Sequence, residues 1–218
     1  MIDKEVVVPG DFLSDDPSKA GTGTYVEGGK VFALAYGILE SRDRLRVISL
    51  GGKYVPLPGD DIIGNVVDFS LSSWKVDINS PYGADLHISE HPQRVDFGDM
   101  CRHIKIGESI ITKVIRVDNE MRVDLTLKGY DLKILRGGRI IDFFHSKIPR
   151  LIGRSGSMIN MIKEECKCAI FVGQNGRIWV NGEGDNMALA IKTIKKIEDE
   201  AHTSGLTAKI AQFLEDER

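Results

Sequence analysis

The pattern of apolar and polar positions along the 218-residue chain begins with short runs of strand-like character. In residues 1–58, runs rich in β-branched residues end at Gly or Pro, as strands joined by turns do. The stretch GTGTYVEGGKVFALAYGILE holds two such runs around Gly28-Gly29, a pair typical of a hairpin turn. Pro56 and Pro58 cannot donate a hydrogen bond to a sheet, so we expect a small all-β domain that ends near residue 58.

Residues 59–128 contain five strand-like runs with regular turns between them. The runs are IIGNVVDFSL, SWKVDINS, GADLHIS, SIITKVIRVDN and MRVDLTLKG. Five short strands at this spacing suit a small closed barrel, with Asp118–Glu120 as the turn between the last two. Trp74 shares the alternation of Val76 and Ile78, so we expect its side chain to face the barrel core.

Residues 129–204 change from a period of two to a helical period. RIIDFFH reads as a strand, and helical spacing begins at Ile148-Pro149, pauses at GRSG and resumes in SMINMIKEECK. Two strands, AIFV and RIWV, then precede a long amphipathic helix with Asp185 as its predicted N-cap. The order β-α-α-β-β-α predicts a compact α+β domain, and residues 205–218 form a helical or disordered tail. The fold class is therefore multidomain, mainly β plus α+β.

The Gly-x-x-Gly motif at residues 153–156 lies between two predicted helices, so the second helix begins with backbone N–H groups that point at the loop. Glycines without Cβ allow a phosphate to approach the backbone, and the N-terminus of a helix favours its negative charge. The alternative is an ordinary turn between helices, but the α+β context and the basic flanks favour a phosphate cradle. Its candidate residues are Lys147, Arg150, Gly153, Arg154, Ser155 and Gly156.

A second motif of the same spacing, GQNG at residues 173–176, lies between two apolar strands instead. Asn175-Gly176 suits the positive φ angles of a type I′ hairpin turn, and no helix N-terminus is nearby to receive a phosphate. We therefore assign this motif to structure.

The net charge of −3 is unevenly distributed. Residues 59–128 hold 8 basic and 12 acidic side chains, whereas residues 129–204 hold 12 basic and 9 acidic ones. A polyanion would therefore meet its favourable field in the third segment. The chain has no apolar run of membrane-spanning length and no signal-peptide pattern, so we expect a soluble, intracellular protein.

Catalytic and metal-binding patterns are missing from the sequence. His87 and His91 have a metal-like spacing only on a helix, and their surroundings predict a strand and a turn. Cys101, Cys166 and Cys168 are odd in number and lack zinc spacing, which indicates reduced structural thiols. Without a nucleophile elbow or a phosphate-binding loop of the Walker type, we expect no enzyme activity, no metal and no cofactor.

The motifs together resemble a known family. IGRSG at Ile152–Gly156 is similar to the signature of KH RNA-binding domains, and GNV and LHISE at Gly64–Val66 and Leu86–Glu90 resemble an S1 domain. With VVPGDFL, GTGTY, YVPLPGD and GQNG, the order resembles the archaeal exosome's RNA-binding cap subunit, the ribosomal RNA-processing protein 4 family. The resemblance implies three non-catalytic, cytoplasmic cap subunits, alone or mixed with a second cap protein, on a hexameric ring that degrades RNA phosphorolytically. It also implies capture of poly(A)-rich RNA.

The S1-like segment departs from the pattern of many S1 domains, which stack bases on two aromatic side chains. Ser72 and Lys75 occupy those positions here, so base stacking is reduced and Lys75, with His87, remains as a candidate RNA contact. His87 could equally be structural. The first 58 residues lack basic or aromatic enrichment, which favours docking on the ring. The alternative function is a stand-alone S1/KH RNA-binding factor in translation or ribosome biogenesis.

Overall fold

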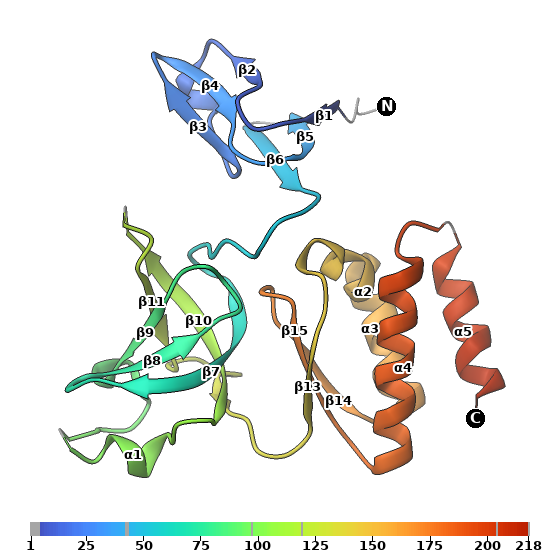
Figure 1. The fold of residues 1–218 in the computed structure, drawn as a ribbon. Coiled ribbons are helices and arrows are strands. Elements are labelled where there is room, and N and C mark those ends of the chain that lie inside the picture. The colour runs from blue at the N-terminus through green and yellow to red at the C-terminus, as the bar shows by residue number, and fades with distance from the viewer. Residues whose placement is uncertain (1–4, 42–43, 97, 119, 204, 218) are drawn as a thin grey trace. The chain divides into compact units, whose positions relative to one another are not determined.

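A computed structural model shows two compact units, which consist of residues Met1–Gly52 and Lys53–Arg218 (Figure 1). The residues that the structure describes are 5–41, 44–96, 98–118, 120–203 and 205–217. No helix within these ranges is long and apolar enough to span a membrane.

The first unit consists of two three-stranded antiparallel sheets. One sheet has the order β1 (Glu5–Val7), β5 (Gly37–Ser41), β6 (Leu45–Ser49), and the other has the order β2 (Phe12–Ser14), β4 (Lys30–Ala33), β3 (Thr24–Glu27). Gly28 and Gly29 both have positive φ and join Glu27 to its partner Lys30, which confirms the predicted hairpin. The core is small: among the described residues, Val7, Ala33 and Val47 form its buried cluster.

The second unit begins with the predicted barrel. Its strands are β7 (Asp61–Phe69), β8 (Ser73–Asp77), β9 (Ala84–His87), β10 (Ser109–Val117) and β11 (Val123–Thr126). The order β11-β9-β8-β7-β10 closes through a pairing of β10 with β11, which confirms a closed five-stranded barrel, and a short β12 (Lys133–Ile134) adds to β10. Helix α1 (Met100–His103) lies between β9 and β10. The predicted turn at Asp118–Glu120 contains Asn119 and so lies outside the described residues.

Two large side chains fill the barrel core. Trp74 is fully buried, as its alternation predicts, and its Nε1–H donates to the Ile104 carbonyl at 3.2 Å. Tyr54 is also buried in this core, and its hydroxyl donates to Asp60 Oδ2 at 2.6 Å. Tyr54 comes directly after the first unit, so the segment that leads into β7 is part of the barrel's packing.

The remaining elements of the second unit form the predicted β-α-α-β-β-α order. They are β13 (Arg139–Asp142), α2 (Ile148–Ile152), α3 (Ser157–Cys166), β14 (Ala169–Val172), β15 (Arg177–Asn181) and α4 (Gly184–Glu200). The sheet has the antiparallel order β13-β15-β14, and the helices cover one of its faces (Figure 1). The prediction of Asp185 as the N-cap of the last helix is wrong. Glu183 is the N-cap, and Asp185 lies in the first turn, where its charge suits the helix dipole.

The tail forms helix α5 (Leu206–Asp216), which packs beside α4 (Figure 1). Leu206, Ile210 and Leu214 are buried in the same core as α3 and α4. Cys166 and Cys168 are buried free thiols, and burial raises the pKa of Cys166 to about 11, which keeps it protonated and unreactive. Cys101, by contrast, is exposed on α1.

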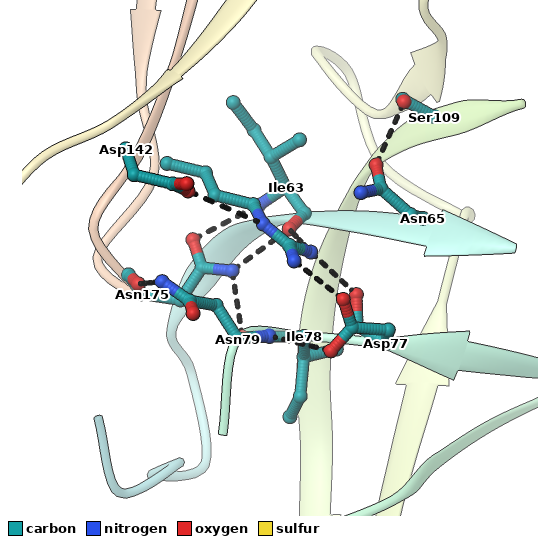
Figure 2. A network of polar contacts seen from close by, with 9 residues as sticks. Ile63, Asn65, Asp77, Ile78, Asn79, Ser109, Asp142 and Asn175 are labelled. Carbon is teal, nitrogen blue, oxygen red and sulfur yellow. Dashed lines mark hydrogen bonds and ion pairs between the residues drawn. The ribbon is translucent and has the colours of Figure 1, made fainter. Parts of the chain in front are cut away.

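The barrel and the α+β domain pack against each other through the GQNG hairpin tip. Asn175 is fully buried there, and its Nδ2–H groups donate to the carbonyls of Ile63 and Ile78 at 2.7 and 2.8 Å (Figure 2). Its Oδ1 accepts from the Ile63 N–H at 3.3 Å, and the Asn79 side chain donates to the Asn175 carbonyl. An apolar cluster of Ile63, Ile111 and Trp179 continues the contact.

The turn type predicted for this hairpin is wrong. Gly176 has φ of +81°, but Asn175 is not among the residues with positive φ, as a type I′ turn would require. The Gly176 N–H donates to the Gly173 carbonyl and the Gly173 N–H to the Arg177 carbonyl. That pattern is a type I turn followed by a glycine bulge, and it turns the Asn175 amide into the barrel. The GQNG motif therefore has a structural role, and it fulfils that role by joining the α+β domain to the barrel.

Candidate nucleic-acid interface

The loop between α2 and α3 has the open geometry that a phosphate cradle needs. Helix α2 ends at Ile152, a short 3-10 turn spans Arg154–Gly156, and α3 begins at Ser157 with Gly156 as its N-cap. Because glycine has no side chain, α3 has no side-chain cap at its N-terminus. Arg154 and Ser155 are exposed, so they and the start of the helix face solvent together.

The two glycines of this loop serve different purposes. Gly153 has φ of +74°, and a Cβ there would lie 2.8 Å from the Met158 Cβ, so only glycine lets the loop pack on the first turn of α3. Gly156 has φ of +80°, but a Cβ there would meet only the Asn160 amide at 3.6 Å. The space above Gly156 is therefore open to a phosphate.

Ser155 occupies the left-handed region, with φ of 53° and ψ of 31°. For a residue with a Cβ, this conformation is less favourable by roughly 1–2 kcal/mol. Such backbone strain clusters at functional sites, and here it projects the loop outward between Arg154 and Gly156.

The predicted basic residues around the loop differ in availability. Arg150 and Arg154 are exposed and form no ion pair within the part of the chain that the structure describes. Lys147 instead donates from Nζ to the Glu198 carbonyl at 2.8 Å, near the C-terminal end of α4. Its charge interacts favourably with that end of the helix dipole, so Lys147 anchors the chain that leads into α2. An RNA contact by Lys147 stays a prediction.

Lys75 and His87 lie on the outer face of the barrel, so the predicted residues form two sites. Lys75 pairs with Asp85 across β8 and β9, with Nζ 2.6 Å from Oδ1. The His87 Nδ1 accepts from the Ser89 N–H at 3.2 Å and lies 2.7 Å from the Ser89 hydroxyl, which leaves Nε2 available. The pairing of Ser73 with His87 places the histidine beside Lys75 on one face.

A cleft of about 590 Å³ opens on this face of the barrel. Its lining includes Lys75, Tyr82, Asp85, Glu120 and Arg122, a mixed set of charges. The sequence pattern does not single out Tyr82 or Arg122. Arg122 lies beside this face because β11 pairs with β9 when the barrel closes. No three His, Cys, Asp or Glu side chains among the described residues lie close enough together to hold a metal ion.

The cations of the barrel are largely neutralised by neighbouring carboxylates. Four pairs have nitrogen–oxygen distances of 3.1 Å or less: Lys75 with Asp85, Lys113 with Asp61, Arg116 with Asp124, and Arg122 with Glu120. Exposed pairs of this kind contribute little stability but cancel the outward field. The loop at residues 153–156 differs from the barrel, because Arg150 and Arg154 beside it form no ion pair among the described residues.

Comparison with known proteins connects both units to one family. Residues 4–51 match the model of the exosome RNA-binding protein RRP4 N-terminal domain, and residues 138–185 match the model of the KH domain. The chain is 45% identical over 218 residues to the exosome complex component Rrp4 of Methanosarcina barkeri, covering all of this chain and 84% of the relative.

Another relative and a solved structure support the same family. The exosome complex component Rrp4 of Thermococcus kodakarensis is 43% identical, with 97% of this chain and 85% of the relative covered. A crystal structure assigned to an exosome complex RNA-binding protein is 39% identical, with a TM-score of 0.70, and the match covers 77% of this chain and 98% of that one.

Proposed function

The chain belongs to the Rrp4 family of exosome components, and on that premise we propose that it is a non-catalytic cap subunit that captures RNA for a phosphorolytic hexameric ring. The observation that carries the proposal is the loop at residues 153–156. It presents on an exposed surface a helix N-terminus without a side-chain cap, the left-handed Ser155, and Arg154, which forms no ion pair with any described residue. Together these groups suit the backbone of single-stranded RNA more than any particular base.

Recognition through phosphates fits the role of a capture subunit. A subunit that delivers many different transcripts gains from contacts that carry no sequence information. The barrel supplies Lys75 and His87 as further contacts, with the charge of Lys75 moderated by Asp85. From the family resemblance, we also propose that the chain prefers poly(A)-rich RNA and acts in the cytoplasm.

The first unit is the part that we assign to docking on the ring. It combines a small buried cluster with eight exposed large apolar side chains among its described residues, and such surfaces mark interaction sites when they are contiguous. The exposed apolar residues are Val6, Val8, Phe12, Val26, Leu34, Tyr36, Ile48 and Leu50. A docked unit would tether the RNA-binding domains near the ring and so raise their effective concentration for RNA without a new RNA contact. We propose three copies per ring, alone or mixed with a second cap protein.

Co-expression with the ring subunits tests the proposal directly. The chain should co-elute with the ring in size-exclusion chromatography and bind single-stranded RNA both alone and in the complex. Phe12→Asp should weaken co-elution while the free protein binds RNA unchanged. A chain that binds RNA but never joins the ring would instead be the stand-alone RNA-binding factor. Failure to bind RNA at all would exclude both functions.

A further inference from the structure

We infer that the connector between the barrel and the α+β domain, residues 128–139, is a separate contact site for single-stranded RNA, centred on Tyr130. This inference rests on the proposed function but adds a site outside the loop at residues 153–156 and outside the barrel cleft. It would place a stacked base and its neighbouring phosphates on the second unit.

The connector is held in place by backbone and apolar contacts on both of its sides. Its strand β12 pairs with β10, with Ile134 opposite Ile110, and the Leu135 N–H donates to the Ser109 carbonyl at 2.8 Å. Leu132 and Leu135 pack against the cluster between the two domains. On the other side, the Trp179 Nε1–H donates to the Gly137 carbonyl at 2.9 Å. Residues 132–137 of the connector are therefore held in place directly after Tyr130.

Tyr130 projects from a turn at the start of this connector. A Cβ on the preceding Gly129 would lie 2.9 Å from Leu132 Cδ1, so the turn is tight and Leu132 packs beneath it. Tyr130 is 102% exposed, more than any other large apolar or aromatic side chain in the described residues, Leu71 included. Both faces of the ring are open to solvent, which is the state of an aromatic side chain that can accept a stacked base.

The connector that carries Tyr130 has an excess of positive charge. The stretch from Lys128 to Arg139 holds four cations and one acid, Asp131. Lys128, Arg136 and Arg139 are exposed and form no ion pair within the described part of the chain, and Lys133 lies over the Trp179 ring at 5.6 Å. The barrel cations are paired with carboxylates, as described above, so the connector contrasts with the surface beside it.

An aromatic ring among unpaired cations is the arrangement that binds single strands without sequence preference, because every base has a face to stack and every nucleotide has a phosphate. A duplex would offer no unstacked base to Tyr130. The connector also provides the base stacking that Ser72 and Lys75 cannot supply in the barrel. The ligand class is therefore single-stranded RNA of any sequence.

Affinity for a fluorescent oligoadenylate, measured by anisotropy over a range of salt concentrations, tests the inference on the full chain. We expect Tyr130→Ala to weaken binding at least about fivefold, the lower end of a base-stacking contribution, without changing the salt slope. Tyr130→Phe should retain binding, because the ring still stacks. Leu71→Ala, which removes a side chain that is 88% exposed on the same unit, is the matched control and should bind like wild type.

The contribution of positive charge to RNA binding is tested with a second pair of variants, Arg136→Ala and Lys105→Ala. Arg136→Ala should lower the salt slope by about 0.7, the value for one phosphate contact on a single strand. Lys105→Ala, which removes from the barrel an exposed cation without an ion pair among the described residues, should leave the slope unchanged.

Three results would overturn the inference. In the first, Tyr130→Ala binds RNA like wild type while wild type still binds RNA and joins the ring, so that the proposed function survives without this site. In the second, Tyr130→Ala retains RNA affinity but loses the ring, which would make Tyr130 a protein contact. In the third, wild type binds no oligoadenylate, and the proposed function fails as well.

Discussion

At the scale of single residues, the loop at residues 153–156 shows which features can be predicted from local spacing. Two glycines three residues apart between helical runs predict an exposed turn at a helix N-terminus, and the structure has one. The hydrogen bond of the Lys147 side chain could not be predicted from local spacing. Its partner, the Glu198 carbonyl, lies fifty-one residues further along the chain, and only the packing of α4 brings the two together.

Changing Arg154 and Ser155 together to Asp should weaken RNA binding without unfolding the protein. Both side chains are exposed, so the free energy of unfolding should change by only about 0.5 kcal/mol. Two carboxylates at the helix N-terminus would repel phosphate, and the loss of Arg154 should lower the salt slope by about 0.7. Arg154→Asp alone is compared with Lys195→Asp on α4, which makes the same change of charge at an exposed position. Equal losses in the two proteins would mean that net charge, and not the loop, governs binding.

Replacing Asn175 by Ala should act on stability instead. The substitution leaves the Ile63 and Ile78 carbonyls and the Ile63 N–H without their buried partner, so the free energy of unfolding should fall by about 2–4 kcal/mol. Gln174→Ala, at the exposed position beside it, should cost less than about 0.5 kcal/mol. Urea titration measures both. An Asn175→Ala protein as stable as wild type would show that the amide does not hold the two domains together.

At the scale of elements, the order and type of the strands and helices could be predicted because turn residues separate the short strands and a helical period marks the helices. The details at their ends depend on neighbours. Asn-Gly at residues 175–176 favours a type I′ turn locally, but three hydrogen bonds of the Asn175 side chain to the barrel favour a different turn. In the same way, Asp185 is a good N-cap in isolation, yet the N-cap of α4 is Glu183, two residues earlier.

The contact between the domains should also depend on pH through Asp77. Burial raises the pKa of its carboxyl, but hydrogen bonds from Arg177 and from the Asn79 N–H lower it by more, so the folded pKa lies below 3.8. A depressed folded pKa means that the carboxylate stabilises the fold above the unfolded pKa, and that this contribution is lost as the pH falls through the folded value.

Urea titrations of wild type and Asp77→Asn over a range of pH check this expectation. Wild type should be the more stable at neutral pH, and the difference should shrink as the pH falls below 3.8. Asp142 lies 3.9 Å from Arg177 and is 83% exposed, so Asp142→Asn is the matched control and should show little pH-dependent difference. A difference between wild type and Asp77→Asn that stays constant across this range would contradict the assignment.

At the scale of the whole molecule, the sequence predicts the three kinds of domain because each has its own periodicity and motifs. It cannot show which segment belongs to which core. Tyr54 lies among the loop residues before Pro56, yet its ring is buried in the barrel and its hydroxyl binds Asp60. That contact depends on the path of the chain, which the local pattern of residues 53–58 does not encode.

Two truncations test the role of this segment. Deleting residues 1–52 should leave a folded protein that binds RNA nearly as well as the full chain but no longer co-elutes with the ring. Deleting residues 1–57 also removes Tyr54, and this fragment should be less stable by roughly 1.5–3 kcal/mol, the contribution of one large buried side chain. Thermal melting compares the two. Equal melting temperatures would show that Tyr54 is dispensable to the barrel.

The rate at which a phosphorolytic exosome ring shortens a labelled oligoadenylate tests the central claim most directly. We predict that the full chain accelerates the ring, that it shortens no RNA alone, and that the protein with Arg154→Asp and Ser155→Asp joins the ring but accelerates it less. Phosphate-dependent shortening by the chain alone, or equal acceleration by wild type and this variant, would contradict the account.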